Sequence, residues 1–191
     1  MLTVASEQLP DRALPQQWLL SGEQAAFEAV FRAYYGRVYA LAYRLLGCRA
    51  AADDVAQEVF LKLYRHPLQP GREHNLLAWL LTVASNLAYN SIRADRRRLA
   101  RETLSEMPGQ DSPIESAEQA LAAARVRAAL AELPERQARL LLLRQADLSY
   151  AECAQALGVS PSSIGTLLAR AERAFVERFT AEAQRAQRRT G

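Results

Sequence analysis

Alanine and leucine dominate the sequence, with 36 Ala and 29 Leu among 191 residues. Both residues have high helix propensity, and apolar side chains recur along the chain at the i, i+3, i+4, i+7 spacing of one helical face. Gly and Pro occur only eight times each, whereas sandwiches and barrels need many turn residues together with β-branched and aromatic strands. The sequence therefore predicts an all-α fold. Its ample apolar content argues against a disordered chain.

Several other classes of protein are excluded. No stretch approaches the roughly 20 uninterrupted apolar residues of a membrane span, and the amino terminus lacks the basic-then-apolar pattern of a secretory signal. Cys48 and Cys153 make no disulfide framework, and two histidines offer little for a metal site. The chain contains no P-loop, no Gly-x-Ser-x-Gly motif and no metal-ligand spacing. We expect a cytoplasmic protein that is not an enzyme, with no cofactor, no metal and no membrane insertion.

The charge is divided unevenly along the chain. Residues 21–101 hold 12 basic and seven acidic side chains, and residues 119–191 hold 11 and seven, whereas residues 102–118 hold five acidic and no basic ones. That acidic stretch contains Met107-Pro108-Gly109 and Ser112-Pro113, which favours a linker over a long loop inside one domain. We predict two small helical domains joined by a flexible linker. The predicted segments are an amino-terminal extension (1–20), a first domain (21–101), an acidic linker (102–120), a second domain (121–180) and a basic tail (181–191).

Three helices are expected in the first domain. The first covers residues 21–47, the second begins at Asp54, which has capping-box spacing to Gln57, and the third begins near Leu76. The inner face of the second helix is predicted to consist of Val55, Val59, Phe60 and Leu63. Residues 66–75 contain two prolines and a glycine and are predicted to form a loop.

The third helix ends in a run of arginines, which is the first feature that indicates a function. Arg93, Arg96, Arg97, Arg98 and Arg101 stand within nine residues and are opposed only by Asp95. A guanidinium group donates two parallel hydrogen bonds to a phosphate, and each neutralised phosphate releases counterions. The run therefore favours nucleic-acid binding, and the alternative is an ordinary solvated helix end with favourable cations at its negative terminus.

The second domain contains a helix-turn-helix pattern. Helices are predicted over 121–133 and 134–145, followed by a short helix that Ser149 and Glu152 open as a capping box. Gly158 then supplies the turn, and Pro161 begins a last helix that extends to about Thr180. An αα-hairpin without a DNA role is the alternative.

The outward face of that last helix is poor in cations. Its exposed positions are predicted to include Ser162, Ser163, Gly165, Thr166 and Ala169, with Arg170 and Arg173 further along. Recognition helices usually present Arg, Lys, Asn or Gln to base edges. We therefore expect this helix to discriminate only weakly between DNA sequences.

Taken together, the motifs resemble those of the extracytoplasmic-function (ECF) sigma factors of bacterial RNA polymerase, the smallest members of the sigma-70 family. The resemblance covers roughly residues 21–179, and the matching stretches are 27–31, 53–64, 79–88, 133–137 and 148–154. It implies a region 2-like helical bundle and a region 4-like helix-turn-helix domain. The implied partners are core RNA polymerase, promoter DNA and an inhibitory anti-sigma factor.

The resemblance also implies three sets of site residues. Core polymerase would dock on Asp54, Gln57, Glu58, Phe60 and Leu63. The minus-ten element, where a base is flipped out of the non-template strand, would be contacted by Asn86, Asn90, Arg93, Arg96 and Arg97. The minus-thirty-five element would be contacted by Ser162, Ser163, Thr166, Arg170 and Arg173.

Two other functions are compatible with the pattern. A free-standing helix-turn-helix regulator would bind duplex DNA without polymerase. A degenerate sigma-like adaptor would bind polymerase or an inhibitor without reading the minus-thirty-five element, which the weakly charged recognition face favours.

Overall fold

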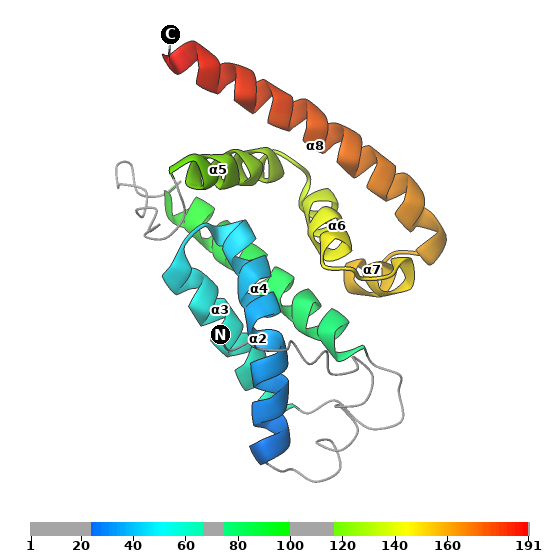
Figure 1. The fold of residues 1–191 in the computed structure, drawn as a ribbon. Coiled ribbons are helices and arrows are strands. Elements are labelled where there is room, and N and C mark those ends of the chain that lie inside the picture. Colours follow the sequence, from blue (N-terminus) through cyan, green and yellow to red (C-terminus); the bar gives the residue numbers. More distant parts are fainter. Residues whose placement is uncertain (1–23, 67–74, 100–116, 191) are drawn as a thin grey trace, which may run out of the picture.

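A computed structural model of the chain describes residues 24–66, 75–99 and 117–190. Within these ranges every regular element is a helix, which confirms the predicted all-α class. Figure 1 shows two lobes, the first of α2–α4 and the second of α5–α8. The predicted amino-terminal extension, Arg101, and most of the predicted loop and linker lie outside the described residues. The helices are α2 (Gln24–Leu46), α3 (Arg49–Arg65), α4 (Leu76–Leu99), α5 (Ala117–Ala131), α6 (Glu135–Gln145), α7 (Tyr150–Leu157) and α8 (Pro161–Thr190).

The first lobe is built around one apolar face of each helix. All four residues predicted for the inner face of α3 are buried, together with Ala52 and Ala56. They pack with side chains of α2 and α4 that are also withdrawn from water, among them Leu41, Leu80 and Leu81. Each fully buried aliphatic side chain stabilises the fold by about 1.5–3 kcal/mol relative to an exposed one. The hydrophobic periodicity thus predicted this lobe correctly.

The predicted start of α3 is wrong. The helix begins at Arg49, five residues before Asp54, and Cys48 is its N-cap residue without a side-chain hydrogen bond. Gly47 has φ +68° and ends α2, so the chain turns sharply and re-enters a helix at once. Three consecutive alanines then continue the helix, and Ala52 is fully buried. Propensity and burial therefore outweigh the capping pattern at Asp54 and Gln57.

The helix-turn-helix of the second lobe forms as predicted. The Ser149 hydroxyl accepts from the Glu152 amide at 3.3 Å, and the Glu152 carboxylate accepts from the Ser149 amide at 2.7 Å. Gly158 adopts φ +64° and ends α7, and the Val159 amide donates to the Ala154 carbonyl at 3.0 Å. Cys153 and Ile164 are fully buried where α7 and α8 cross. Both caps close the turn, and the apolar contact fixes the angle between the two helices.

Two other predicted boundaries differ. Pro134 is the N-cap of α6 and not its first helical residue. More importantly, α8 does not end at Thr180 but continues to Thr190, so the segment predicted as a basic tail extends the helix. Arg178 lies 3.6 Å and Arg185 3.1 Å from carboxylate oxygens of Glu132, which follows α5. The Arg185 pair thus joins the extension to the turn that follows α5.

The two lobes pack directly against each other. Figure 1 shows α4 running beneath α6 and α7, and the carboxyl end of α2 reaching α5. At the amino end of α4, the Asn75 amide nitrogen donates to the Glu152 carboxylate while its oxygen accepts from the Ala78 amide at 3.1 Å. Arg127 of α5 lies over the Tyr43 ring of α2, 5.9 Å from the ring centroid. This docked arrangement places the candidate surfaces described below.

Candidate functional site

The outer face of α3 is a stripe of acidic, polar and apolar side chains. Asp54 and Gln57 are exposed and Glu58 is half-exposed, with an ion pair of 3.1 Å to Lys62. Phe60 and Leu63, predicted as docking residues, are 2% and 0% exposed and support this face from beneath. The exposed apolar side chains of the stripe are Leu61 (39%) and Tyr64 (63%). Sequence reasoning missed both, although their spacing of seven and ten residues from Asp54 places them on its helical face.

An aromatic row along α2 adjoins this stripe. Phe31 is 37% exposed, and its ring centroid lies 4.8 Å from those of Phe60 and Tyr35. The Tyr35 hydroxyl donates to the Asp53 carboxylate at 2.7 Å. Burial, and secondly this hydrogen bond, raise the pKa of Tyr35 to about 12, which keeps the phenol protonated as a donor. The row and the stripe together form an apolar face with an acidic margin, which suits a protein partner more than a nucleic acid.

The arginine run lies at the carboxyl end of α4. Asn86, Asn90, Arg93 and Arg97 are exposed and share one helical face because they are spaced by four, three and four residues. Asn90, Arg93 and Arg97, together with Arg96, line an open hollow of about 540 Å³. The structure thus brings four of the five residues predicted to contact the minus-ten strand around one hollow. Asn86 lies one turn further back on the same face.

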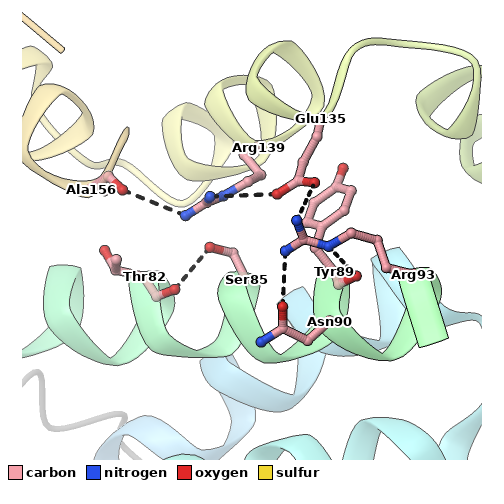
Figure 2. A network of polar contacts seen from close by, with 8 residues as sticks. All are labelled: Thr82, Ser85, Tyr89, Asn90, Arg93, Glu135, Arg139 and Ala156. Carbon is pink, nitrogen blue, oxygen red and sulfur yellow. Dashed lines mark hydrogen bonds and ion pairs between the residues drawn. The ribbon is translucent and has the colours of Figure 1, made fainter. Parts of the chain in front are cut away.

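A polar network joins this hollow to the second lobe (Figure 2). Arg93 Nη1 lies 3.7 Å from the Glu135 carboxylate, and Glu135 also pairs with Arg139 at 3.7 Å. Arg139 is only 14% exposed, and burial lowers the pKa of its guanidinium despite the nearby carboxylate. Tyr89 lies half-buried beside them, and burial, followed by Glu135, raises its pKa to about 12. Neither Glu135 nor Arg139 was among the predicted site residues.

The residues predicted to contact the minus-thirty-five element lie on an exposed face of α8. Ser162, Ser163, Thr166, Arg170 and Arg173 are all exposed. They lie on one side of α8, because Ile164 and Ala171, on the opposite side, are fully buried. The Ser160 and Ser162 hydroxyl oxygens lie 2.8 Å apart at the start of the helix. The first turns of this face contain hydroxyl groups, and its cations come only at Arg170 and beyond.

A fourth feature is a groove of about 670 Å³ between the lobes. Side chains of α2, α5, α6 and α8 line it, and most of its surface is apolar. Arg44 and Arg127 lie among its lining residues. Its principal apolar and aromatic lining residues are Tyr39, Tyr43, Val126, Leu130, Leu141 and Phe175. No helix in the described ranges is both long and apolar enough to cross a membrane.

The fold and these surfaces define a two-lobed helical protein with an arginine-lined hollow on one lobe and a helix-turn-helix on the other. The family model of Sigma-70 region 2 matches residues 30–98, and that of Sigma-70 region 4 matches residues 123–175. The ECF RNA polymerase sigma factor SigL of Mycobacterium tuberculosis is 33% identical over 169 residues, covering 82% of this chain and 92% of SigL. The chain therefore belongs to the ECF sigma factors of the sigma-70 family.

Two further relatives agree with this assignment. The ECF RNA polymerase sigma factor SigE of Mycolicibacterium smegmatis is 34% identical over 164 residues, covering 80% of this chain. The chain spans only 61% of the length of that relative. Among solved structures, CnrH in complex with the cytosolic domain of CnrY is 26% identical with a TM-score of 0.64, covering 90% of this chain and 97% of CnrH.

Proposed function

We propose that this protein binds core RNA polymerase, directs it to a subset of promoters and helps to open the DNA there. The main support is the presence, on one chain of this family, of an arginine-lined hollow and a helix-turn-helix on separate lobes. In this proposal residues 21–101 and 121–180 act as two domains in the cytoplasm, where they position polymerase. They supply no catalytic chemistry.

Core polymerase docks on the outer stripe of α3 in this proposal. Asp54, Gln57 and Glu58 provide polar contacts, and Leu61 and Tyr64 provide the apolar area that protein interfaces bury at their centres. Phe60 and Leu63 hold the stripe in place from the core.

The hollow of α4 then receives the melted minus-ten strand. Arg93, Arg96 and Arg97 neutralise its phosphates, and Asn86 and Asn90 offer amides that donate to and accept from bases. A flipped base costs a few kcal/mol to extrude, so several phosphate contacts along one helix face are needed to hold the opened strand.

Transcription with purified components tests this role. The triple variant Arg93→Ala, Arg96→Ala, Arg97→Ala should keep core binding and lose promoter-dependent initiation when transcripts made on genomic DNA by core enzyme are sequenced. Arg97→Ala and Arg98→Ala form a matched pair, because Arg98 is also exposed but lies off the helical face shared by Asn90, Arg93 and Arg97, and it pairs with Asp95 at 3.4 Å. Arg97→Ala should lower initiation more than Arg98→Ala. Failure of the unmodified protein to bind core polymerase would refute the proposal.

An adaptor that binds polymerase without reading the minus-thirty-five element is the second candidate. The uncharged first turns of α8 favour it, because Ser162, Ser163 and Thr166 discriminate poorly between bases. The same transcription assay separates the two functions: promoter-dependent initiation that survives all three arginine substitutions would favour an adaptor that binds polymerase without reading DNA through α4.

We also propose an inhibitory anti-sigma protein as a partner. The related CnrH has been solved with the cytosolic domain of a second protein, CnrY. In this chain the groove between the lobes offers an apolar surface with cations among its lining residues. An amphipathic helix with acidic side chains suits both properties.

A further inference from the structure

Two of the arginines assigned to the DNA strand are held by the second lobe. All three nitrogens of the Arg93 guanidinium group have acceptors: Nε donates to the Tyr89 carbonyl at 3.3 Å, Nη2 to the Asn90 side chain at 2.9 Å, and Nη1 faces Glu135. Figure 2 shows Arg93 between Asn90 of α4 and Glu135 of α6. The second lobe thereby engages Arg93, which also holds the side chain of Asn90 within α4.

Arg96 is engaged in the same way. Its Nη2 lies 3.5 Å from the carbonyl oxygen of Ala131, the last residue of α5. Carbonyls in the last turn of a helix have no partner within the helix and form its negative end. A carboxylate and a helix terminus of the second lobe thus occupy the cations of α4. Arg97 and Arg98, by contrast, contact acceptors on α4 itself: Arg97 Nε donates to the Arg93 carbonyl at 3.2 Å, and Arg98 lies 3.4 Å from the Asp95 carboxylate.

We propose that Glu135 is an intramolecular competitor of the DNA strand, which latches the lobes together until the strand or polymerase displaces it. This inference rests on the proposed function of Arg93. A carboxylate and a phosphate both take up the donor fork of a guanidinium group, so Arg93 cannot pair fully with both. While the lobes are docked, the Arg93 end of the hollow is closed to the strand.

The geometry makes the latch reversible. The Arg93 and Glu135 side chains are 54% and 34% exposed, and ion pairs of this kind change equilibria by only a few-fold. Glu135 keeps Arg139 as a partner after Arg93 leaves, so separation of the lobes leaves no carboxylate without a cation. Arg93 in turn exchanges the carboxylate for a phosphate. Both charges remain paired in the open state.

The test compares two carboxylates that stand three residues apart. Glu135→Gln removes the charge facing α4, whereas Glu132→Gln removes the same charge from a residue that pairs with Arg178 and Arg185 of its own lobe. Binding of a fluorescein-labelled oligo(dT) strand to the full chain is measured by anisotropy at several salt concentrations. Small-angle X-ray scattering reports whether the lobes separate.

Glu135→Gln should raise strand affinity by about two- to five-fold beyond the effect of Glu132→Gln. It should also steepen the plot of log affinity against log salt by about 0.7, the value for one further phosphate contact on a single strand, and enlarge the radius of gyration. In an Arg93→Ala background, Glu135→Gln should give no such gain.

Two results would overturn the latch, and they are distinguishable. If Arg93→Ala weakens strand binding while Glu135→Gln behaves like Glu132→Gln, Arg93 binds DNA but Glu135 does not compete for it. If neither Arg93→Ala nor Glu135→Gln changes strand binding, the proposed role of Arg93 itself fails, and the latch fails with it.

Discussion

Leu61 and Leu63 are two positions apart on α3, and substituting each one distinguishes docking on core polymerase from folding of the chain. Leu63 is fully buried and Leu61 is 39% exposed on the outer stripe. Truncating a buried leucine removes its transfer free energy and leaves a cavity, so Leu63→Ala should lower the free energy of unfolding by about 3–5 kcal/mol. Leu61→Ala removes a side chain that is already partly in water, and about 1 kcal/mol or less is expected.

These energies predict different melting temperatures. For a chain of 191 residues, each kcal/mol shifts the midpoint by about 2–4 °C, so Leu63→Ala should melt about 6–20 °C lower and Leu61→Ala within about 4 °C of the unmodified protein. Helix content followed by circular dichroism during heating measures both shifts. Core-polymerase affinity, measured at a temperature where both variants are folded, should show the reverse order: about five-fold or more weaker for Leu61→Ala and nearly unchanged for Leu63→Ala.

The opposite result is that the variant with the lower melting temperature is also the variant with the weaker affinity for core polymerase. Should Leu63→Ala lose core binding while still folded, and Leu61→Ala bind normally, the docking surface would not be the exposed stripe of α3. Equal destabilisation by both substitutions would instead show that Leu61 is buried in solution.

Three further outcomes test the fold and its thiols. Ser149→Ala removes the N-cap of α7 and should lower the free energy of unfolding by about 1 kcal/mol in urea denaturation. Gly158→Ala has room for its Cβ but must adopt φ +64°, at a cost of about 1–2 kcal/mol, whereas Gly47→Ala should cost more, because its Cβ would also meet a side chain of α5 at 2.7 Å. Burial raises the pKa of the Cys153 thiol, so a disulfide reagent at pH 8 should modify the half-buried Cys48 and reach Cys153 only after unfolding.

Local sequence signals predicted most of the helices. Ser149, Glu152 and Gly158 lie within ten residues of the chain, and their capping and turn chemistry indicates the helix-turn-helix without any tertiary information. The start of α3 could not be read in the same way, because Asp54 and Gln57 match a cap that burial of Ala52 overrides. The last turns of α8 come near Glu132, in the turn after α5, through ion pairs from Arg178 and Arg185, and no local pattern reports contacts between residues so far apart in the sequence.

The candidate sites show the same difference between local sequence signals and tertiary contacts. Leu61 and Tyr64 were missed, although helical spacing from Asp54 would have placed them on the outer stripe, whereas the run from Arg93 did indicate a phosphate-binding surface. Spacing could not reveal that Glu135 faces Arg93, since the two residues are 42 positions apart and meet only when the lobes dock. Docking, unlike helix formation, is a tertiary property.

The uneven charge of the sequence poses a physical question that the docked lobes answer. Both lobes are net positive, so they should repel one another. The second lobe, however, presents helix carboxyl ends to the first: Arg96 lies at the end of α5, and Arg37 donates to the Ala146 carbonyl, at the end of α6, at 3.2 Å. Helix termini attract cations without adding net charge. Two basic lobes can therefore associate through a few half-exposed contacts, and a polyanion that pairs with the same arginines can separate them. Both lobes keep the positive charge that the proposed DNA binding requires.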